Sequence, residues 1–130
     1  WHHDLDVPAS KAFVAAFSKK HGKPPENHAW IEYISFKIMA QAMNETKSTD
    51  TEKLIAYLEK QTEFDILKGR KGYFRNWDHQ LIQEAYPFTV KPKGQAKDKW
   101  DFLALGPAVP NANEPLEVIN PTKEQNPCTL

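Results

Sequence analysis

Apolar side chains recur with a helical period in the first part of the chain. Between Asp6 and Gly22, the side chains of Phe13, Val14 and Phe17 share one face, with small alanines around them. Asp6 is a suitable N-cap residue and Gly22 a suitable helix stop. The pattern therefore predicts an amphipathic helix between these two residues.

The next segment, ENHAWIEYISFKIMAQAM (residues 26–43), is apolar around most of a helix. We expect a helix from about His28 to Asn44, with Asn27 as its N-cap. Its apolar residues form two stripes, the first made of Trp30, Ile34, Ile38 and Ala42 and the second of Tyr33, Phe36, Ala40 and Met43. A helix with two apolar stripes needs cover on more than one side. The rest of this 130-residue chain offers too few partners, so we expect something else to pack on this helix.

A third helix is predicted within STDTEKLIAYLEKQ, residues 48–61. Thr49 and Glu52 have the spacing of a capping box. A narrower apolar face follows, formed by Leu54, Ile55 and Leu58. Beyond this helix the glycines and aromatic residues indicate short extended pieces and turns.

Residues 84–91 and 99–105 predict two strands joined by a polar loop around residues 93–97. We expect the strands to pair in antiparallel fashion. Because side chains alternate along a strand, Phe88 and Val90 should share one face and Thr89 should lie on the other.

Residues 107–130 are rich in proline and asparagine, which predicts an extended tail that packs along a surface or is partly disordered. Cys128, near its end, is the only cysteine of the chain, so no internal disulfide is expected. We interpret it as an ordinary tail cysteine rather than a nucleophile. The sequence begins at Trp1 and not at Met, from which we expect a processed or truncated chain.

Charge and composition then narrow the class of protein. The chain has 17 Lys and Arg and 17 Asp and Glu, so its formal net charge is zero. This balance gives no electrostatic reason to expect a nucleic-acid or anionic-membrane partner. No apolar run approaches the ~20 residues that span a bilayer.

Several polar clusters are candidates for chemistry. His2, His3, Asp4 and Asp6 lie close together in WHHDLD and could hold a metal ion, but a solvated terminus is the better interpretation. No phosphate-binding loop and no GxSxG or HExxH motif is present. The sequence therefore predicts neither an enzyme nor a bound metal or cofactor.

Two other polar groups are expected to be structural. Lys68, Arg70 and Lys71 form a basic cluster that we interpret as a solvated loop, because acidic residues precede it. Asp78 is expected to cap local backbone amides in a turn.

An ordered series of motifs provides the strongest functional signal. F-x-x-x-F-x-x-K-H-G-K-P-P at residues 13–25 is followed by A-W-I-E-Y, M-A-Q-A-M, S-T-D-T-E-K-L, L-K-G-R-K-G-Y-F and W-D-H. This series resembles the C-terminal part of the solute-binding proteins of branched-chain amino-acid-type ABC transporters, the type I periplasmic binding proteins. The resemblance covers about residues 1–105, and the tail departs from the shorter ending of the best-known members.

The resemblance implies an α/β fold of two lobes joined by three chain crossings, with the ligand in the cleft between them. This chain would be the C-terminal fragment of such a protein. Residues 1–82 would form the helical part of the N-terminal lobe, including the last crossing. Residues 83–106 would form a strand pair of the C-terminal lobe, and residues 107–130 the tail. The missing cover of the second helix would then be a parallel sheet built by the absent part.

The resemblance also implies a function and candidate ligand-binding residues. The protein would be the periplasmic substrate-binding component of an ABC importer and would bind a small polar solute such as an amino acid, an amide or a related acid. Its partners would be that solute, the permease in the inner membrane and the remainder of its own chain. His28, at the start of the second helix, would point into the cleft, and Trp1 would form part of its rim. The backbone amides of that helix start could also suit an anionic group.

A different class of function is also consistent with the apolar helix. The chain could be a free-standing small interaction domain that docks a partner through this helix. Such a domain should be monomeric and cooperatively folded, whereas a fragment should expose a broad apolar face or self-associate through it.

Overall fold

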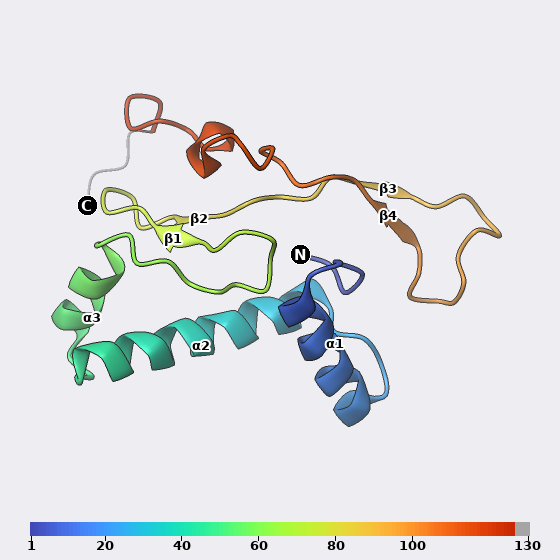
Figure 1. Ribbon diagram of the computed structural model, residues 1–130, viewed down its shortest axis with the longest axis horizontal. Helices are drawn as coiled ribbons and strands as arrows, with labels where there is room; N and C mark the ends of the chain where they lie inside the picture. The colour runs from blue at the N-terminus through green and yellow to red at the C-terminus, as the bar shows by residue number, and fades with distance from the viewer. Residues whose placement is uncertain (127–130) are drawn as a thin grey trace.

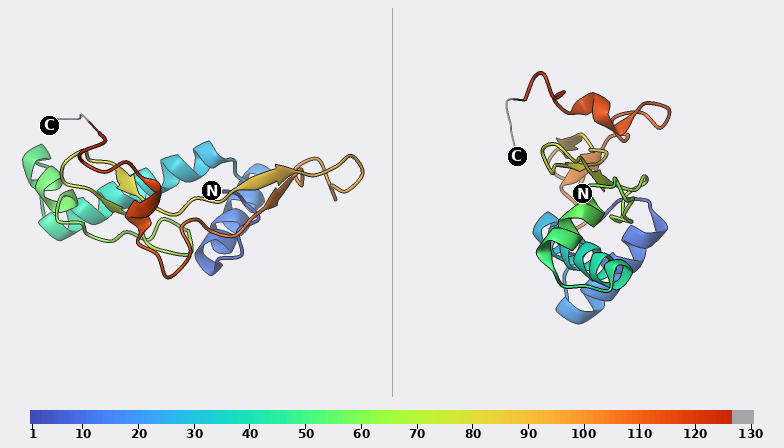
Figure 2. Two further views of the ribbon diagram at one scale, coloured as in Figure 1. Left: turned by 90° about the horizontal axis from the view of Figure 1, so that it is seen from above. Right: turned by 90° about the vertical axis from the view of Figure 1, so that its left-hand side faces the viewer.

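The computed structural model describes residues 1–126 and arranges them in three layers (Figures 1 and 2). The helices form one layer, two short strand pairs and their loops form the second, and the C-terminal segment lies across the outer side of the second. The elements are α1 (Pro8–His21), α2 (Asn27–Thr46), α3 (Thr51–Leu58), β1 (Tyr73–Phe74), β2 (Leu81–Ile82), β3 (Phe88–Val90), β4 (Leu103–Leu105) and the 3-10 helix η1 (Leu116–Ile119).

Helix α1 confirms the predicted segment but not its predicted cap. Its N-cap position is Val7, and no side chain caps the first turn. Asp6 instead pairs with Lys11 at 2.5 Å, on the exposed surface. The helix ends as expected at Gly22, which adopts a left-handed conformation (φ 68°) that costs glycine little.

Helix α2 shows the two stripes that the sequence predicts. The residues buried on it are Trp30, Ile34, Ile38 and Ala42. In the second stripe, Phe36 remains 74% exposed and Tyr33 46% exposed. Asn27 is the first residue of the helix rather than its cap, because Glu26 occupies the N-cap position. Within residues 1–126, the second stripe is covered only in part, where the Tyr33 ring contacts Phe13 with centroids 4.7 Å apart.

The cap of α3 lies one residue after the predicted one. Asp50, and not Thr49, is the N-cap residue, and its carboxylate accepts a hydrogen bond from the Lys53 amide at 3.1 Å. Asp and Thr can both cap a helix, so the choice depends on which backbone position turns into the helix first. The buried residue of this helix is Leu54.

The β3–β4 hairpin confirms the predicted antiparallel pair. Phe88 pairs with Leu105, Thr89 with Ala104 and Val90 with Leu103. The strands are shorter than predicted because Pro87 and Pro92 flank β3 and lack the N–H groups that a longer ladder needs.

Strands β1 and β2 form a second antiparallel pair, in a region for which the sequence predicts only short extended pieces and turns. Tyr73 pairs with Ile82 and Phe74 with Leu81. With two residues in each strand, the alternation of polar and apolar positions is too short to be recognised in the sequence.

The core lies between α2 and the segment that leads to β1. It contains Trp30, Ile34, Ile38, Phe64, Ile66 and Leu67. The indole Nε1 of Trp30 donates a hydrogen bond to the Ile66 carbonyl oxygen at 2.7 Å. This bond satisfies a buried donor and fixes the position of the segment on the helix.

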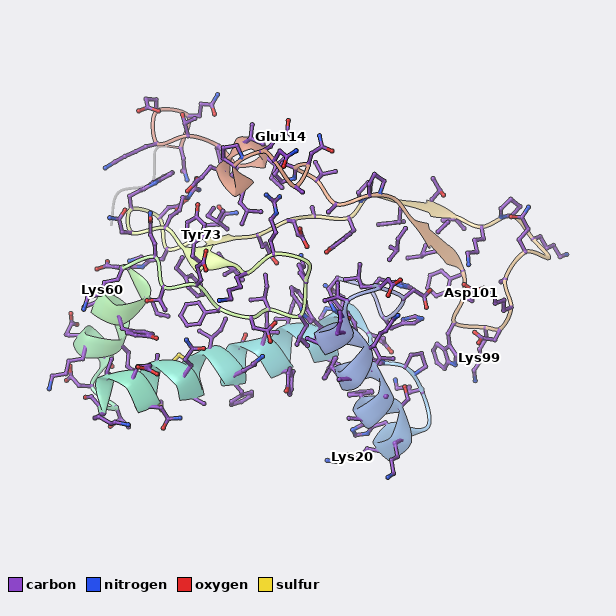
Figure 3. The ribbon with its side chains drawn as sticks, viewed as in Figure 1. Lys20, Lys60, Tyr73, Lys99, Asp101 and Glu114 are labelled. Atoms are coloured by element: carbon purple, nitrogen blue, oxygen red, sulfur yellow. The ribbon has the colours of Figure 1, made fainter. Side chains whose placement is uncertain are left out.

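The C-terminal segment, residues 107–126, packs along the strand layer, and the 3-10 helix η1 interrupts it (Figure 3). Arg70 donates hydrogen bonds to the carbonyl oxygens of Pro110 and Glu114, at 2.9 and 2.8 Å. The Tyr73 hydroxyl donates to Glu117, which lies in η1, at 2.9 Å. Cys128 lies outside the described residues.

Candidate functional site

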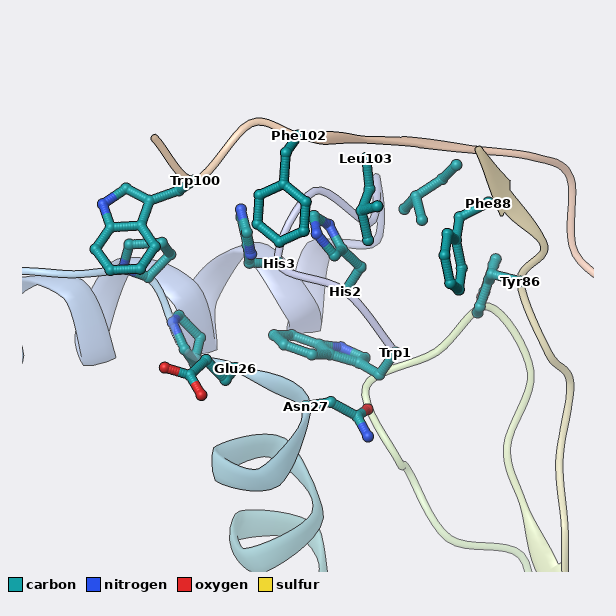
Figure 4. Close-up of a pocket in the computed structure, with 13 residues that line it drawn as sticks. Trp1, His2, His3, Glu26, Asn27, Tyr86, Phe88, Trp100, Phe102 and Leu103 are labelled. Carbon is teal, nitrogen blue, oxygen red and sulfur yellow. The ribbon is translucent and has the colours of Figure 1, made fainter. Parts of the chain in front are cut away.

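A pocket of about 540 Å³ lies where the helical layer meets the β3–β4 hairpin (Figure 4). One side is formed by the N-terminal segment and the turn that leads into α2, and the other by the hairpin. The residues that line it are Trp1, His2, His3, Pro24, Pro25, Glu26, Asn27, Tyr86, Phe88, Trp100, Phe102, Leu103 and Leu105. The pocket thus joins two parts of the chain that the resemblance assigns to different lobes.

Trp1 is held in one orientation by three neighbours. Its indole Nε1 donates a hydrogen bond to the Ser10 hydroxyl at 3.0 Å. Its ring lies parallel to that of Trp30, with centroids 6.1 Å apart, and meets Phe13 edge-on at 5.7 Å. Ser10 is fully buried, so this hydrogen bond is shielded from water.

His2 and His3 form a stacked pair at the wall of the pocket, with ring centroids 4.0 Å apart. The Asp4 amide donates a hydrogen bond to His2 Nδ1 at 3.2 Å. Burial, followed by the neighbouring His3, lowers the pKa of His2 below its ordinary value. A neutral ring at this place offers a hydrogen-bond donor and an acceptor rather than a charge.

The same segment contains a possible set of metal ligands. Ligand atoms of His2, His3 and Asp4 lie within 4.8 Å of one another, and this is the only such group in residues 1–126. Two imidazoles and one carboxylate are a donor set suited to zinc or a related ion. The expectation that no metal binds here therefore remains a prediction.

A polar network lies beneath Tyr86. Lys68 is 8% exposed and donates a hydrogen bond to the Glu84 carbonyl oxygen at 2.6 Å. Its ammonium lies 5.0 Å from the centre of the Trp30 ring. The Glu84 carboxylate accepts hydrogen bonds from the Gly69 amide, at 2.6 Å, and from the Tyr86 hydroxyl.

This network corrects the prediction of a solvated basic loop. Burial lowers the pKa of Lys68 to about 8, against the opposing effect of Glu84. Arg70 is half-buried and ties the C-terminal segment down, whereas Lys71 is exposed as predicted. The sequence pattern failed here because Glu84, the acidic partner, lies 14 residues from Arg70 in the chain.

The two predicted ligand-binding residues do not meet in this pocket. Trp1 lines it, but His28 is exposed in the first turn of α2 and is absent from the lining. Asn27, the residue before His28, lines the pocket. The role of His28 in binding therefore remains a prediction.

The aromatic residues on the hairpin side of the pocket were not predicted from the sequence to belong to a site. These are Tyr86, Phe88, Trp100 and Phe102. The signal that could have identified them as site residues is the density of aromatic residues in and beside the two strands. The alternation of side chains assigns residues to a face of the strand pair but does not assign them to a site. Pairing of the strands with each other was predictable, but their position beside Trp1 was not.

A second hollow, of about 410 Å³, lies along the exposed side of α2. It is lined by Trp30, Ile31, Ile34, Ser35, Ile38, Met39, Leu58, Phe74, Leu81 and Gln83. Gln83 Oε1 is buried and has no hydrogen-bond partner among the described residues. This hollow borders the buried stripe of the helix, and no residue of the second stripe lines it.

Comparison with known proteins identifies the class to which this arrangement belongs. The family model described as "Periplasmic binding protein" matches residues 1–96. The helices followed by small antiparallel strand pairs are a fragment of the two-lobed α/β fold of type I periplasmic binding proteins. The chain belongs to the periplasmic binding protein family. No curated protein matches the sequence.

Solved structures agree with this assignment. A periplasmic binding protein from Burkholderia mallei is similar over 98% of this chain and 32% of its own, with a TM-score of 0.81 and 27% identity. A branched-chain amino acid ABC transporter periplasmic ligand-binding protein from Burkholderia xenovorans matches 83% of this chain and 28% of its own, with a TM-score of 0.73 and 27% identity. An ABC-type branched-chain amino acid transporter protein from Rhodopseudomonas palustris is 32% identical over 82% of this chain and 28% of its own, with a TM-score of 0.66.

The chain therefore spans about a third of the length of these relatives. The family consists of transport binding proteins and not of enzymes, which confirms the non-enzymatic class predicted from the sequence. In residues 1–126 we find no helix with the length and apolarity required to cross a membrane.

Proposed function

We propose that this chain is the C-terminal third of a periplasmic solute-binding protein that delivers a small polar solute to an ABC importer. The observation that carries the proposal is the family match over residues 1–96, together with a pocket between the helical layer and the β3–β4 hairpin. The solute would be an amino acid, an amide or a related acid. The relatives from B. xenovorans and R. palustris are both described as branched-chain amino acid transport proteins, which supports this class.

The pocket is our candidate for this chain's share of the interlobe cleft. Residues 1–82 would belong to the N-terminal lobe and residues 83–106 to the C-terminal lobe. A solute that contacts both Trp1 and the hairpin would favour the closed arrangement of the lobes, because only that arrangement offers both contacts. The closed protein would then dock on the permease in the inner membrane.

The uncovered side of α2 supports the fragment interpretation. Phe36 is 74% exposed, and Ile31, Met39 and Met43 are also open to solvent. An apolar surface of this kind is unusual on a complete soluble domain. We assign its cover to the remainder of the chain.

The proposal is tested on the full-length protein that contains this chain. Amino acids, amides and aromatic acids are screened for a rise in melting temperature, and hits are measured by calorimetry. A solute present at about 100 times its Kd should stabilise the protein by about 2.7 kcal/mol. A full-length protein that no member of these classes stabilises would contradict the proposal.

A further inference from the structure

We propose that the pocket receives a planar aromatic ring of the solute and that the Trp1 indole is the surface on which this ring stacks. This inference rests on the proposed function and specifies the chemical class of the solute at that site. Nothing in the names of the similar proteins suggests an aromatic ligand, since two of them mention branched-chain amino acids.

The first argument is the rigidity of Trp1. Trp30 lies parallel to its ring on one side, Phe13 meets its edge, and Ser10 holds its nitrogen. Figure 4 shows the indole lying across the pocket, with His2, His3 and Phe102 on the side away from α2. An aromatic face that is already fixed loses little conformational entropy when a flat ring is placed on it. The side chain is thus preorganised for stacking.

The second argument is the chemistry of the other walls. Tyr86, Phe88, Trp100 and Phe102 line the hairpin side of the pocket. Phe88 is 60% exposed and Phe102 is 49% exposed, so a ligand can still cover them. Aromatic rings favour offset or edge-on contacts with other rings, and a flat ring between Trp1 and these side chains can make both.

The third argument is charge. The lining residues, all within residues 1–126, include no lysine or arginine, and the acidic Glu26 is paired with Lys23 at 3.1 Å. Lys68 and Lys99 lie against Tyr86 and Trp100 but do not line the pocket, so a ligand carboxylate would meet no lysine or arginine among the lining residues. His2 and His3 instead offer ring nitrogens, and Asn27 offers an amide. The pocket therefore fits the ring end of a solute, and the charged end would be held by the remainder of the protein.

The test uses the full-length protein and probes matched in size. Calorimetry compares phenylalanine with cyclohexylalanine, benzoate with cyclohexanecarboxylate, and both aromatic probes with leucine. The flat and saturated members of each pair have the same carbon skeleton and charge, so their difference reports stacking. We expect the aromatic member of the bound pair to bind about 2- to 12-fold more tightly.

Variants connect this preference to Trp1. Trp1→Leu should abolish the preference for the aromatic member, and Trp1→Phe should retain most of it. Trp77→Leu is the matched control, because Trp77 stacks on Arg75 and is absent from the pocket lining. The quantity compared between variants is the ratio of the affinities for the aromatic and the saturated probe. A general loss of stability lowers both affinities and leaves this ratio unchanged.

Each outcome decides the proposal. Equal or tighter binding of the saturated probes, or of leucine alone, overturns the aromatic assignment and leaves the solute-binding function intact. A preference that survives Trp1→Leu overturns the role of Trp1. Failure of all five probes also overturns the aromatic assignment, and the broader solute screen then decides the function separately.

Discussion

The buried ammonium of Lys68 makes the stability of the protein depend on pH. Burial lowers its pKa from 10.5 to about 8. Below pH 8 the amine is protonated in both the folded and the unfolded states, so the cost of burying the charge is fully present. Between about pH 8 and 10 the unfolded chain binds more protons than the folded one, and stability rises with pH.

We therefore expect the free energy of unfolding to increase by up to about 1.4 kcal/mol per pH unit in this window. Tyr73 and Tyr86 oppose the rise only above pH 10, because their pKa values are raised to about 12. Urea unfolding at several pH values measures the slope. Lys68→Met should remove it, and Lys71→Met, at an exposed position, should not. A wild-type stability that stays flat from pH 8 to 10 would contradict the assignment.

His28 offers a second test at the same scale. If it contacts the solute, as the resemblance implies, replacing it by alanine in the full-length protein removes a hydrogen bond. The affinity for a solute found in the screen should then fall by about 1 kcal/mol or more, as measured by calorimetry. An unchanged affinity with a lower melting temperature would make His28 a structural residue of the α2 start. Asn27→Ala is the neighbouring comparison, since Asn27 lines the pocket.

At the scale of a residue, the sequence predicted what depends on a regular period. The buried set of Trp30, Ile34, Ile38 and Ala42 follows directly from the spacing on one helix face. The partners of Lys68 and Arg70 could not be predicted, because Glu84 comes near them only after the chain has turned through β1 and β2. Contacts between distant polar residues carry no periodic signal.

At the scale of an element, α2 is the most informative helix. Its first stripe is buried within this chain, whereas we propose that its second stripe is buried only by the remainder of the protein. Ile34→Ala removes a buried side chain and should cost about 2–5 kcal/mol, both in this chain alone and in the full-length protein. Phe36→Ala should change the stability of this chain alone, measured at a concentration at which it is monomeric, by no more than about 0.5 kcal/mol, because the side chain is exposed in the monomer. In the full-length protein it should cost about 3–5 kcal/mol, because we propose that the side chain is buried there.

Chemical unfolding of both variants in both forms measures the four values. Ile34→Ala is the internal control, since its cost should not depend on the rest of the protein. A Phe36→Ala variant that is neutral in the full-length protein would show that the second stripe is not covered by the remainder of the chain.

The C-terminal segment is fastened to the strand layer through Arg75. This guanidinium is 2% exposed, donates hydrogen bonds to the Pro121 carbonyl oxygen at 2.8 Å and to Glu117 at 3.2 Å, and pairs with Asp78. Asp78 also accepts from the Gln80 amide at 3.1 Å, which confirms its predicted role in a turn. The buried Arg75 therefore holds both η1, through Glu117, and the turn that contains Asp78.

Removing Arg75 should be far more costly than removing an exposed cation. Arg75→Met leaves Asp78 buried without its charged partner and should lower the free energy of unfolding by about 3–5 kcal/mol. Lys37→Met breaks the exposed pair with Asp65 and should cost about 1 kcal/mol or less. Urea unfolding compares the two. If the double variant Arg75→Met/Asp78→Leu recovers part of the lost free energy of unfolding, the unpaired buried charge of Asp78 is the cause. Equal costs for Arg75→Met and Lys37→Met would refute this account.

At the scale of the whole molecule, the order of elements was predictable and their assembly was not. The helices and the β3–β4 pair follow from local patterns, and the resemblance gave the family that the comparison confirms. The β1–β2 pair and the packing of residues 107–126 depend on contacts between segments with no local signature. The pocket was missed for the same reason, because its walls come from residues 1–27 and from the β3–β4 hairpin, which are far apart in the sequence.

The uncovered surface of α2 leads to a prediction for the chain produced on its own. Phe36, Tyr33 and Met43 lie exposed along one side of the helix. Ile31 and Met39, on another side, are exposed as well and line a hollow of about 410 Å³. Burying this surface between two copies would remove apolar area from water, which is the main driving force of association. We therefore expect the isolated chain either to self-associate or to have a low melting temperature. Size-exclusion chromatography and a thermal melt measure both properties.

A matched variant shows whether the second stripe is the cause. Phe36→Gln combined with Met43→Gln should make the isolated chain monomeric without touching the buried stripe, while Lys19→Gln combined with Lys20→Gln, on the exposed side of α1, should leave association unchanged. The alternative hypothesis, a free-standing interaction domain, predicts a different oligomeric state and stability. A wild-type chain that is monomeric and melts in one sharp transition above about 65 °C, the top of the usual range for mesophilic domains, would favour that alternative over a fragment. Such a chain would be stable without the cover that α2 lacks, and the proposed function would lose its structural support.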